Sequence, residues 1–260
     1  MIHIAITAGG TEEPIDGIRK ITNISSGSLG WHCLEAVLSY MEKQNRTDFM
    51  VHYIKAPKAV TKKLNAKHAS FVDFVSVTNT QSVYDSIDEM MDEVNIGVFI
   101  HAMAISDFSY SYSVSIGDLA EELYQTFVED KSISKVKIEA ILTNPIHKHS
   151  AGEKISSSNN IVMGFETTPK VISLIKKKNP DTFLVGFKLV KHNNDNNLLR
   201  QAEKLRLTND CDAVFANEAS DLSEDNHAGI LLYKGEIVTR PVGKKQIAEA
   251  IVKLAMEHCN

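Results

Sequence analysis

The chain has 260 residues, a length that suits one large domain or one domain with a subdomain, and 43% of its residues are hydrophobic, enough for a normal core. Its formal net charge of −5 gives no support for nucleic-acid binding, and no apolar run approaches the roughly 20 residues that cross a bilayer. Because the N-terminus also lacks the features of a signal peptide, we expect a cytoplasmic protein with no nucleic-acid or membrane partner.

Cysteine and histidine spacing gives little support for a metal or a disulfide. Cys33, Cys211 and Cys259 are far apart in the sequence and form no CxxC pair, and no HExxH motif or spaced His/Asp cluster occurs. The chain also has no GxSxG motif, which argues against an acyl-enzyme mechanism. We therefore predict no protein metal site.

The first part of the chain alternates between strand and helix patterns. Residues 2–7 are rich in isoleucine and predict a buried strand that ends at a glycine turn, and residues 8–24 predict a polar loop. Apolar residues recur on one face of a predicted helix over 29–43, which Ser25 or Ser26 can cap. The same patterns predict strands at 49–54, 71–77 and 96–101 and a helix at 83–94. This alternation is typical of βαβ units with a parallel sheet.

The second part begins less regularly. A helix is expected at 118–127, whereas residues 129–160 are rich in Lys, Ser and Asn and predict a mobile flap. Alternation then resumes, with strands expected at 161–165, 182–189, 213–216, 230–233 and 237–240 and helices at 168–178, 198–207 and 244–258. We predict an α/β protein, a single nucleotide-binding domain over 1–260. Its fold would be Rossmann-like with three layers, a mostly parallel central sheet and the flap.

Two glycine-bearing turns lie close to the start of the first helix. Residues 7–11 (TAGGT) leave the first strand, and residues 25–30 (SSGSLG) open the helix. A helix N-terminus offers N–H groups and a partial positive charge, and glycine lets phosphate oxygens approach closely, so these turns fit a triphosphate. Ordinary turn glycines are the alternative interpretation. The pattern is neither GxGxxG nor GxxxxGK[ST], so a standard NAD site or P-loop is unsupported.

The loop between the two turns contains side chains that can bind anions or carbonyls. Arg19 can hold a phosphate or a carboxylate in fork geometry, and Asn23 can donate its amide to a carbonyl or phosphoryl oxygen. Alternatively, Arg19 is a solvated charge and Asn23 forms a turn.

Residues 6–30 (ITAGGTEEPIDGIRKITNISSGSLG) resemble the opening signature of phosphopantothenate–cysteine ligases, also called phosphopantothenoylcysteine synthetases. Further similar blocks follow in the family's order, namely AISDF at 104–108, EKISS at 153–157, VGFKL at 185–189 and FANEAS at 215–220. The resemblance spans most of the chain. Because no flavin-containing half is seen before residue 1 of this sequence, we expect the stand-alone bacterial form. The region 109–150 matches the family poorly.

The resemblance implies a role for each matching residue. Nucleotide binding is implied for Gly9, Gly10, Ser25, Gly27, Gly30, Phe187 and Asn217. Asn23, Ala104 and Asp107 would hold the pantothenate part, and Arg19 would reach the substrate phosphate across a dimer interface. Lys154 would close over the reacting centre from the flap, with Asn23 as the other catalytic residue. The flap carries fewer lysines than in fused bacterial members, and Lys131, Lys135 or Lys137 could add charge.

Each of these residues also has an interpretation without a ligand. Asp107 follows an apolar strand and could cap a helix or a turn, and Lys154 could be a solvated lysine. Phe187 lies in an apolar strand and could be a core residue, and Asn217 could form a turn at a strand end.

The activity implied by the resemblance is the nucleotide-dependent joining of 4'-phosphopantothenate to L-cysteine in coenzyme A biosynthesis. The co-substrate would be CTP, as in bacterial members, with ATP as the alternative, and Mg²⁺ would be held mainly by phosphates and water. A homodimer is also implied. Two other functions are open from the residues alone: an NAD(P)-dependent Rossmann-type oxidoreductase and a nucleotide-sensing module without turnover. The oxidoreductase predicts a GxGxxG motif after the first strand, where this chain has AGGT.

Overall fold

The computed structural model describes residues 1–150, 152, 160–191, 195–218 and 227–258. The chain folds into two compact units, each of which draws on segments that are separated in the sequence. The first unit consists of Met1–Thr11, Asn23–Ile105 and Lys170–Asn260, and the second of Glu12–Thr22 and Ser106–Pro169. The expectation of a single domain over 1–260 stays a prediction.

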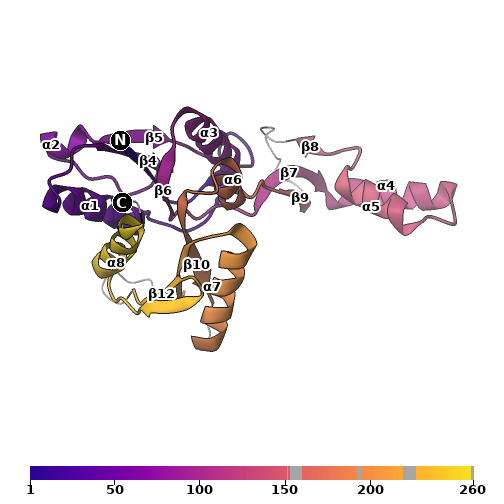
Figure 1. Cartoon of the computed structure of the whole chain (residues 1–260). Helices are drawn as coiled ribbons and strands as arrows, with labels where there is room; N and C mark the ends of the chain where they lie inside the picture. Colours follow the sequence, from indigo (N-terminus) through magenta and orange to yellow (C-terminus); the bar gives the residue numbers. More distant parts are fainter. Residues whose placement is uncertain (151, 153–159, 192–194, 219–226, 259–260) are drawn as a thin grey trace. The chain divides into compact units, whose positions relative to one another are not determined.

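The first unit is built on an eight-stranded sheet with the strand order β13-β12-β11-β10-β6-β1-β4-β5 (Figure 1). Six strands pair in parallel, namely β1 (Ile2–Ala8), β4 (Phe49–Lys55), β5 (Val72–Ser76), β6 (Ile96–His101), β10 (Phe183–Val190) and β11 (Ala213–Glu218). The last two, β12 (Gly229–Tyr233) and β13 (Glu236–Thr239), are antiparallel. Its helices are α1 (Ser28–Lys43), α2 (Ala66–Ala69), α3 (Thr80–Glu93), α6 (Val171–Lys178), α7 (Asp195–Asn209) and α8 (Lys244–Glu257).

Helices cover both faces of this sheet because its buried strands are apolar on both sides. In β1, Ile4 and Ile6 point to the core shared with α1 and α8, whereas Ala5 points to the core shared with α3, α6 and α7. The α/β class, the mostly parallel sheet and the three layers are therefore confirmed. No helix within the described ranges is both long and apolar enough to cross a membrane.

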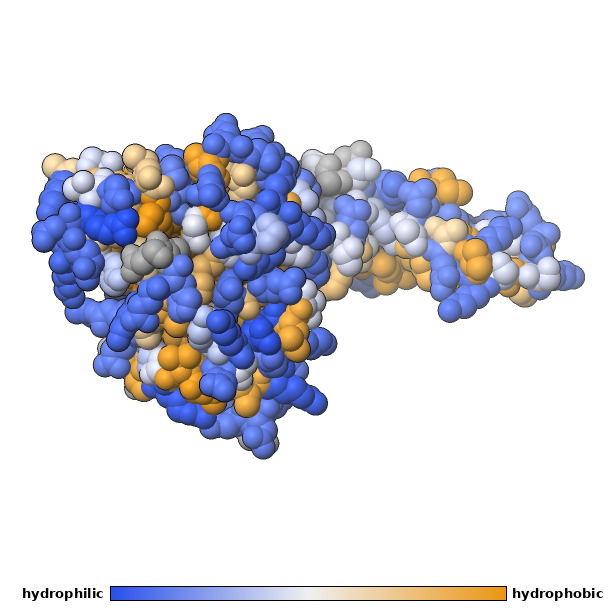
Figure 2. Space-filling model, in the orientation of Figure 1, coloured by the Kyte–Doolittle hydropathy of each residue, from blue (hydrophilic) through white to orange (hydrophobic). Residues whose placement is uncertain are grey.

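The second unit contains a hairpin, a three-stranded sheet and two helices. The hairpin pairs β2 (Glu12–Pro14) with β3 (Lys20–Thr22), and the sheet has the order β8-β7-β9, with β7 (Phe108–Ser115), β8 (His149–Ser150) and β9 (Ile161–Thr167). Helices α4 (Ile116–Glu129) and α5 (Lys135–Thr143) follow β7, and Tyr112, Val114 and Leu119 form the small core between them and the sheet. Orange patches over α4 and α5 in Figure 2 mark hydrophobic residues at the surface. Phe127 of α4 and Val136 of α5 are large exposed hydrophobic residues.

Three sequence-based expectations need correction. The predicted polar loop 8–24 contains the β2–β3 hairpin, which a period-based pattern misses because each strand has only three residues. The predicted weakly structured segment 129–160 contains α5, whose first turn is capped by the Ser134 side chain accepting from the Lys137 N–H. Finally, α1 is capped by Gly27 and by no side chain, so the predicted serine cap is wrong. The mobility of the flap stays a prediction.

Candidate functional site

The carboxyl ends of β1 and β6 form the point where the strand order reverses, because β4 lies on one side of β1 and β6 on the other. Open α/β sheets bind their ligands at such a point. Beyond the regular strands, the Ala104 N–H donates to the Gly9 carbonyl at 2.8 Å, and the Thr11 N–H donates to the Ala104 carbonyl at 3.1 Å. The structure thus joins Gly9 and Gly10 to Ala104, which lies far from them in the sequence.

The start of α1 is arranged to favour an anion. Gly27 caps the helix in a left-handed conformation with a φ of 70° and offers no side-chain acceptor, and the first turn carries no acidic residue. The Ser26 hydroxyl accepts from the Ser28 N–H at 3.4 Å. Nearby, the Ser25 hydroxyl accepts from the Gly27 N–H at 3.4 Å, a long hydrogen bond. The partial positive charge of the helix start is therefore not neutralised by an acid in its first turn.

The glycines of both turns are required by packing within the protein. A Cβ on Gly27 would lie 2.8 Å from the Gly9 nitrogen and 3.0 Å from the Ala59 Cβ, and a Cβ on Gly30 would lie 2.7 Å from the Ala8 Cβ. Gly9 itself has a φ of 95°, which L side chains rarely adopt. These glycines bring the start of α1 against the end of β1, and their contact with a nucleotide stays a prediction.

The segment after β4 completes this packing and was missed by sequence reasoning. The Ala56 N–H donates to the Ala8 carbonyl at 3.0 Å, and the Val60 N–H donates to the Ser26 carbonyl at 2.9 Å. Small side chains are needed here because Ala56 and Ala59 approach Gly9 closely. Nothing in the alanine-containing sequence itself signals such a role.

Asn23 lies at the same strand ends. Asn23 is exposed, and its side-chain amide donates to the Ile105 carbonyl at 2.9 Å. Ile105 directly follows Ala104, which is hydrogen-bonded to Gly9 and Thr11. A Cβ on Gly10 would overlap the Asn23 carbonyl oxygen, so Gly10 and Asn23 are in close backbone contact. Asn23 thus fixes the chain after β6, which is a structural role beside the predicted substrate contact.

Phe187 and Asn217 lie on β10 and β11 and point to the same face of the sheet as α1. Phe187 packs against Phe215, with ring centroids 5.9 Å apart, and Asn217 continues the side-chain alternation of Ala213 and Phe215. Asn217 is buried, and its amide donates to the Glu218 carbonyl at 3.4 Å. The partly buried Phe187 fits the interpretation as a core residue, and base binding by either residue stays a prediction.

His101 is a buried polar residue at the end of β6 that the sequence motifs did not indicate. Its Nδ1 lies 3.1 Å from the Thr7 hydroxyl, which accepts from the Met103 N–H at 3.2 Å. Burial lowers the pKa of His101 to about 4, so the imidazole is neutral at pH 7. The pair Thr7–His101 therefore ties β1 to β6 directly beneath the predicted site.

Among the described residues, the predicted site residues of the second unit are Arg19 and Asp107. Arg19, on the turn between β2 and β3, donates from Nε and Nη2 to the Asp16 carboxylate at 3.0 and 2.6 Å. Asp107 is exposed before β7, and its carbonyl accepts from the Thr168 N–H at 3.1 Å. Lys154 lies outside the described residues.

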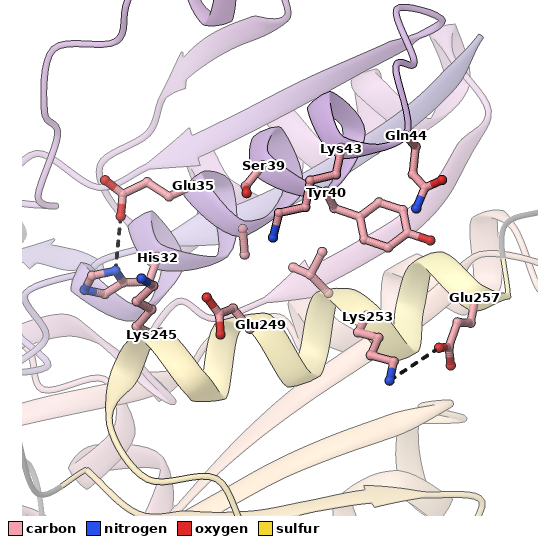
Figure 3. Close-up of a pocket in the computed structure, with 12 residues that line it drawn as sticks. His32, Glu35, Ser39, Tyr40, Lys43, Gln44, Lys245, Glu249, Lys253 and Glu257 are labelled. Atoms are coloured by element: carbon pink, nitrogen blue, oxygen red, sulfur yellow. Dashed lines mark ion pairs between the residues drawn. The ribbon is translucent and has the colours of Figure 1, made fainter.

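No group of three or more His, Cys, Asp or Glu side chains in the described ranges is placed to hold a metal ion. A surface groove of about 840 Å³ lies between α1 and α8 (Figure 3). Ion pairs of His32 with Glu35 and of Lys253 with Glu257 line it, and it contains none of the predicted site residues.

Comparison with known families gives a match along nearly the whole chain. The family described as DNA/pantothenate metabolism flavoprotein C-terminal domain matches residues 1–116 and 118–258. The chain belongs to this family. The family resemblance seen in the glycine turns and in the later motifs is thereby confirmed.

Several proteins named for coenzyme A biosynthesis are similar to this chain. The coenzyme A biosynthesis bifunctional protein CoaBC of Thermococcus kodakarensis is 25% identical over 251 residues, which are 96% of this chain and 49% of that protein. The protein of the same name from Vibrio vulnificus is 30% identical over 105 residues, or 40% of this chain and 22% of that protein. Two of the curated relatives match 96% of this chain, and the chain spans about half the length of each of them.

Solved structures of similar proteins have the same fold. The DNA/pantothenate metabolism flavoprotein from Streptococcus pneumoniae is 28% identical, with a TM-score of 0.77 over 99% of this chain and 100% of that chain. A Cab2 variant in complex with phosphopantothenate-cysteine is 15% identical, with a TM-score of 0.67 over 99% of this chain and 86% of that chain. The latter likeness supports the fold alone.

Proposed function

We propose that this protein is a phosphopantothenate–cysteine ligase that acts in coenzyme A biosynthesis. The observation that carries the proposal is the family match over residues 1–116 and 118–258. It is supported by the CoaBC proteins, whose name assigns them to coenzyme A biosynthesis. The co-substrate is CTP, with ATP as the alternative.

The reaction requires activation because a carboxylate in water has a poor leaving group for attack by an amine. The carboxylate of 4'-phosphopantothenate attacks the α-phosphorus of CTP, pyrophosphate leaves, and an acyl-cytidylate anhydride forms. The amine of L-cysteine then attacks the carbonyl carbon, CMP leaves with the bonding electrons, and the amine loses its proton. The product is phosphopantothenoylcysteine, with a new C–N bond.

The residues at the ends of β1 and β6 have the properties that this chemistry needs. N–H groups at the start of α1, next to Gly27, face no acid in their own turn and would stabilise negative charge on the phosphates. Gly9, Gly10, Ser25 and Gly30 shape this turn, and Phe187 and Asn217 would bind the base and ribose. Mg²⁺, held by phosphates and water, would neutralise part of the triphosphate charge.

The other predicted residues would act on the acid substrate. Asn23, Ala104 and Asp107 would hold the pantothenate part, Arg19 its phosphate, and Lys154 would close over the reacting groups. We also propose a homodimer in the cytoplasm, in which Arg19 serves the neighbouring subunit. Exposed apolar side chains of the second unit, such as Tyr124, Phe127 and Val128, support an association surface.

A stepwise assay of pyrophosphate release tests the proposal. With CTP, phosphopantothenate and Mg²⁺ but no cysteine, we expect release of up to one equivalent, and with cysteine we expect continuous turnover to the amide product. A protein that releases no pyrophosphate with CTP or ATP is not this ligase. Titration with NADPH, followed by fluorescence, would in that case show whether the fold serves an oxidoreductase.

A further inference from the structure

The turn between β2 and β3 contains a buried carboxylate that serves an exposed arginine. The side chain of Asp16 is 3% exposed, whereas that of Arg19 is 45% exposed. Oδ1 of Asp16 accepts from the backbone N–H groups of Ile18 and Arg19 at 2.9 and 2.7 Å. Oδ2 accepts from Nε and Nη2 of Arg19 at 3.0 and 2.6 Å. One oxygen therefore holds the turn, and the other holds the guanidinium.

This division fixes the direction of the arginine. A guanidinium is planar and has five N–H donors, of which Asp16 takes two on the Nε–Nη2 side. The remaining three lie toward the Nη1 side, and two of them can bind a phosphate in parallel. Without the carboxylate, the long arginine side chain would sample many rotamers and would lose that freedom on binding.

Backbone contacts hold the turn itself in place. The Ile15 N–H donates to the Arg19 carbonyl at 2.9 Å, and the Gly152 N–H donates to the Ile15 carbonyl at 3.1 Å. The Arg19 hydrogen bonds also keep the pKa of Asp16 low, at about 2, so the carboxylate stays ionised near neutral pH. The hydrogen-bonded pair of the Asp16 carboxylate and the Arg19 guanidinium, called the anchor below, is thus present under any assay condition near pH 7.

We propose that Asp16 is a positioning residue that orients the Arg19 guanidinium toward the phosphate of the acid substrate. Asp16 does not touch the substrate and acts through Arg19. This inference rests on the proposed function, because the phosphate of 4'-phosphopantothenate is the ligand that Arg19 would bind.

The variant Asp16→Asn separates the two tasks of the carboxylate. Its Oδ1 can still accept from the backbone of the turn, whereas an amide in the place of Oδ2 turns a donor toward Nε and Nη2 of Arg19. We expect the KM for phosphopantothenate to rise by roughly tenfold or more, with kcat changed by less than about threefold. The matched control is Asp48→Asn, because Asp48 accepts from Nε and Nη2 of Arg46 at 2.9 and 2.8 Å, just before β4 in the first unit. It should leave the KM unchanged.

A double-mutant cycle distinguishes positioning from a general structural effect. In the background Arg19→Ala, the change Asp16→Asn should raise the KM no further, because the group that it orients is gone. With pantothenate, which lacks the phosphate, as the substrate, neither change should raise the KM. An unchanged KM in Asp16→Asn, or penalties that multiply in the double variant, would overturn the inference.

A measurement on the unaltered protein keeps the inference testable if Asp16→Asn does not fold. In NMR spectra of the wild-type protein, the Arg19 Nε–H should exchange slowly with water compared with the Nε–H of exposed Arg240, and fast exchange would contradict the anchor. If the wild-type protein forms no phosphopantothenoylcysteine, the proposed function fails, whereas the exchange result reports on the anchor alone.

Discussion

A single buried imidazole gives the site region a pH-dependent stability. The pKa of His101 is lowered by burial to about 4, whereas an unfolded histidine titrates near 6.5. Below pH 6.5 the unfolded state binds a proton that the folded state does not. The free energy of unfolding therefore decreases as the pH is lowered to about 4. His101 alone should remove roughly 2 kcal/mol between pH 7.5 and 5.

Urea denaturation of the wild-type protein and of His101→Gln at both pH values measures this contribution. The control is the same exchange at an exposed position, His147→Gln, since His147 lies at the surface. We expect His101→Gln to be less stable at pH 7.5 and to lose less stability on acidification. An identical loss in both proteins would show that His101 is not the group responsible.

Asn23 differs from the other predicted site residues because it has a visible structural partner. Asn23→Ala removes the hydrogen bond to the Ile105 carbonyl, which should cost about 1 kcal/mol of unfolding free energy. Turnover should fall by at least about tenfold if Asn23 also holds the substrate. Asn179→Ala is the control, because its amide donates to the Asn95 side chain at the amino end of the sheet. If the two variants lose similar stability but Asn23→Ala loses much more turnover than Asn179→Ala, the functional role of Asn23 is supported. If both variants have the same turnover, that role is refuted.

At the scale of elements, the fit between β1 and α1 depends on the absence of one methyl group. Gly30→Ala improves helix propensity by up to about 1 kcal/mol, but its Cβ would lie 2.7 Å from the Ala8 Cβ and 3.1 Å from the Thr7 carbonyl oxygen. Because both neighbours belong to a buried strand, we expect a net loss of roughly 1–3 kcal/mol in thermal or urea unfolding.

Gly117→Ala is the matched control in helix α4. Its Cβ would meet only the Ser115 hydroxyl at 3.7 Å, so the substitution should be neutral or slightly stabilising. If Gly30→Ala were as stable as Gly117→Ala, α1 could move away from β1 without cost. The close packing of the two turns would then not be required.

Most helices and strands with a long periodic pattern were predicted from the sequence, but the alternating strand β7 at Phe108–Ser115 was not. The helix predicted at 29–43 is α1 at Ser28–Lys43, and the strand predicted at 96–101 is β6 with the same bounds. The cap of α1 could not be predicted, because the choice of Gly27 over the serines depends on contacts with Gly9 and Ala59. The β2–β3 hairpin was missed because short, charged strands carry no periodic signal.

At the scale of the whole molecule, topology explains why remote motifs share one region. The sequence could show that residues 9–10, 25–30 and 104 each match a family motif, and only the pairing of β1 with β6 shows that Gly9 and Ala104 are hydrogen-bonded. Residues without a motif, such as Ala59 and His101, came from the structure alone. Their roles depend on which distant residues pack beside them.

Metal removal distinguishes an ion that arrives with the nucleotide from one that is part of the fold. No cluster of metal-ligating side chains is found in the parts of the chain that the structure describes, and the proposed Mg²⁺ is held by phosphates and water. We therefore expect EDTA to abolish pyrophosphate release while leaving the thermal unfolding temperature of the nucleotide-free protein unchanged. Added Mg²⁺ should restore activity fully. A fall in the unfolding temperature with EDTA would instead indicate a structural metal, because an ion bound only to the folded state stabilises it by mass action.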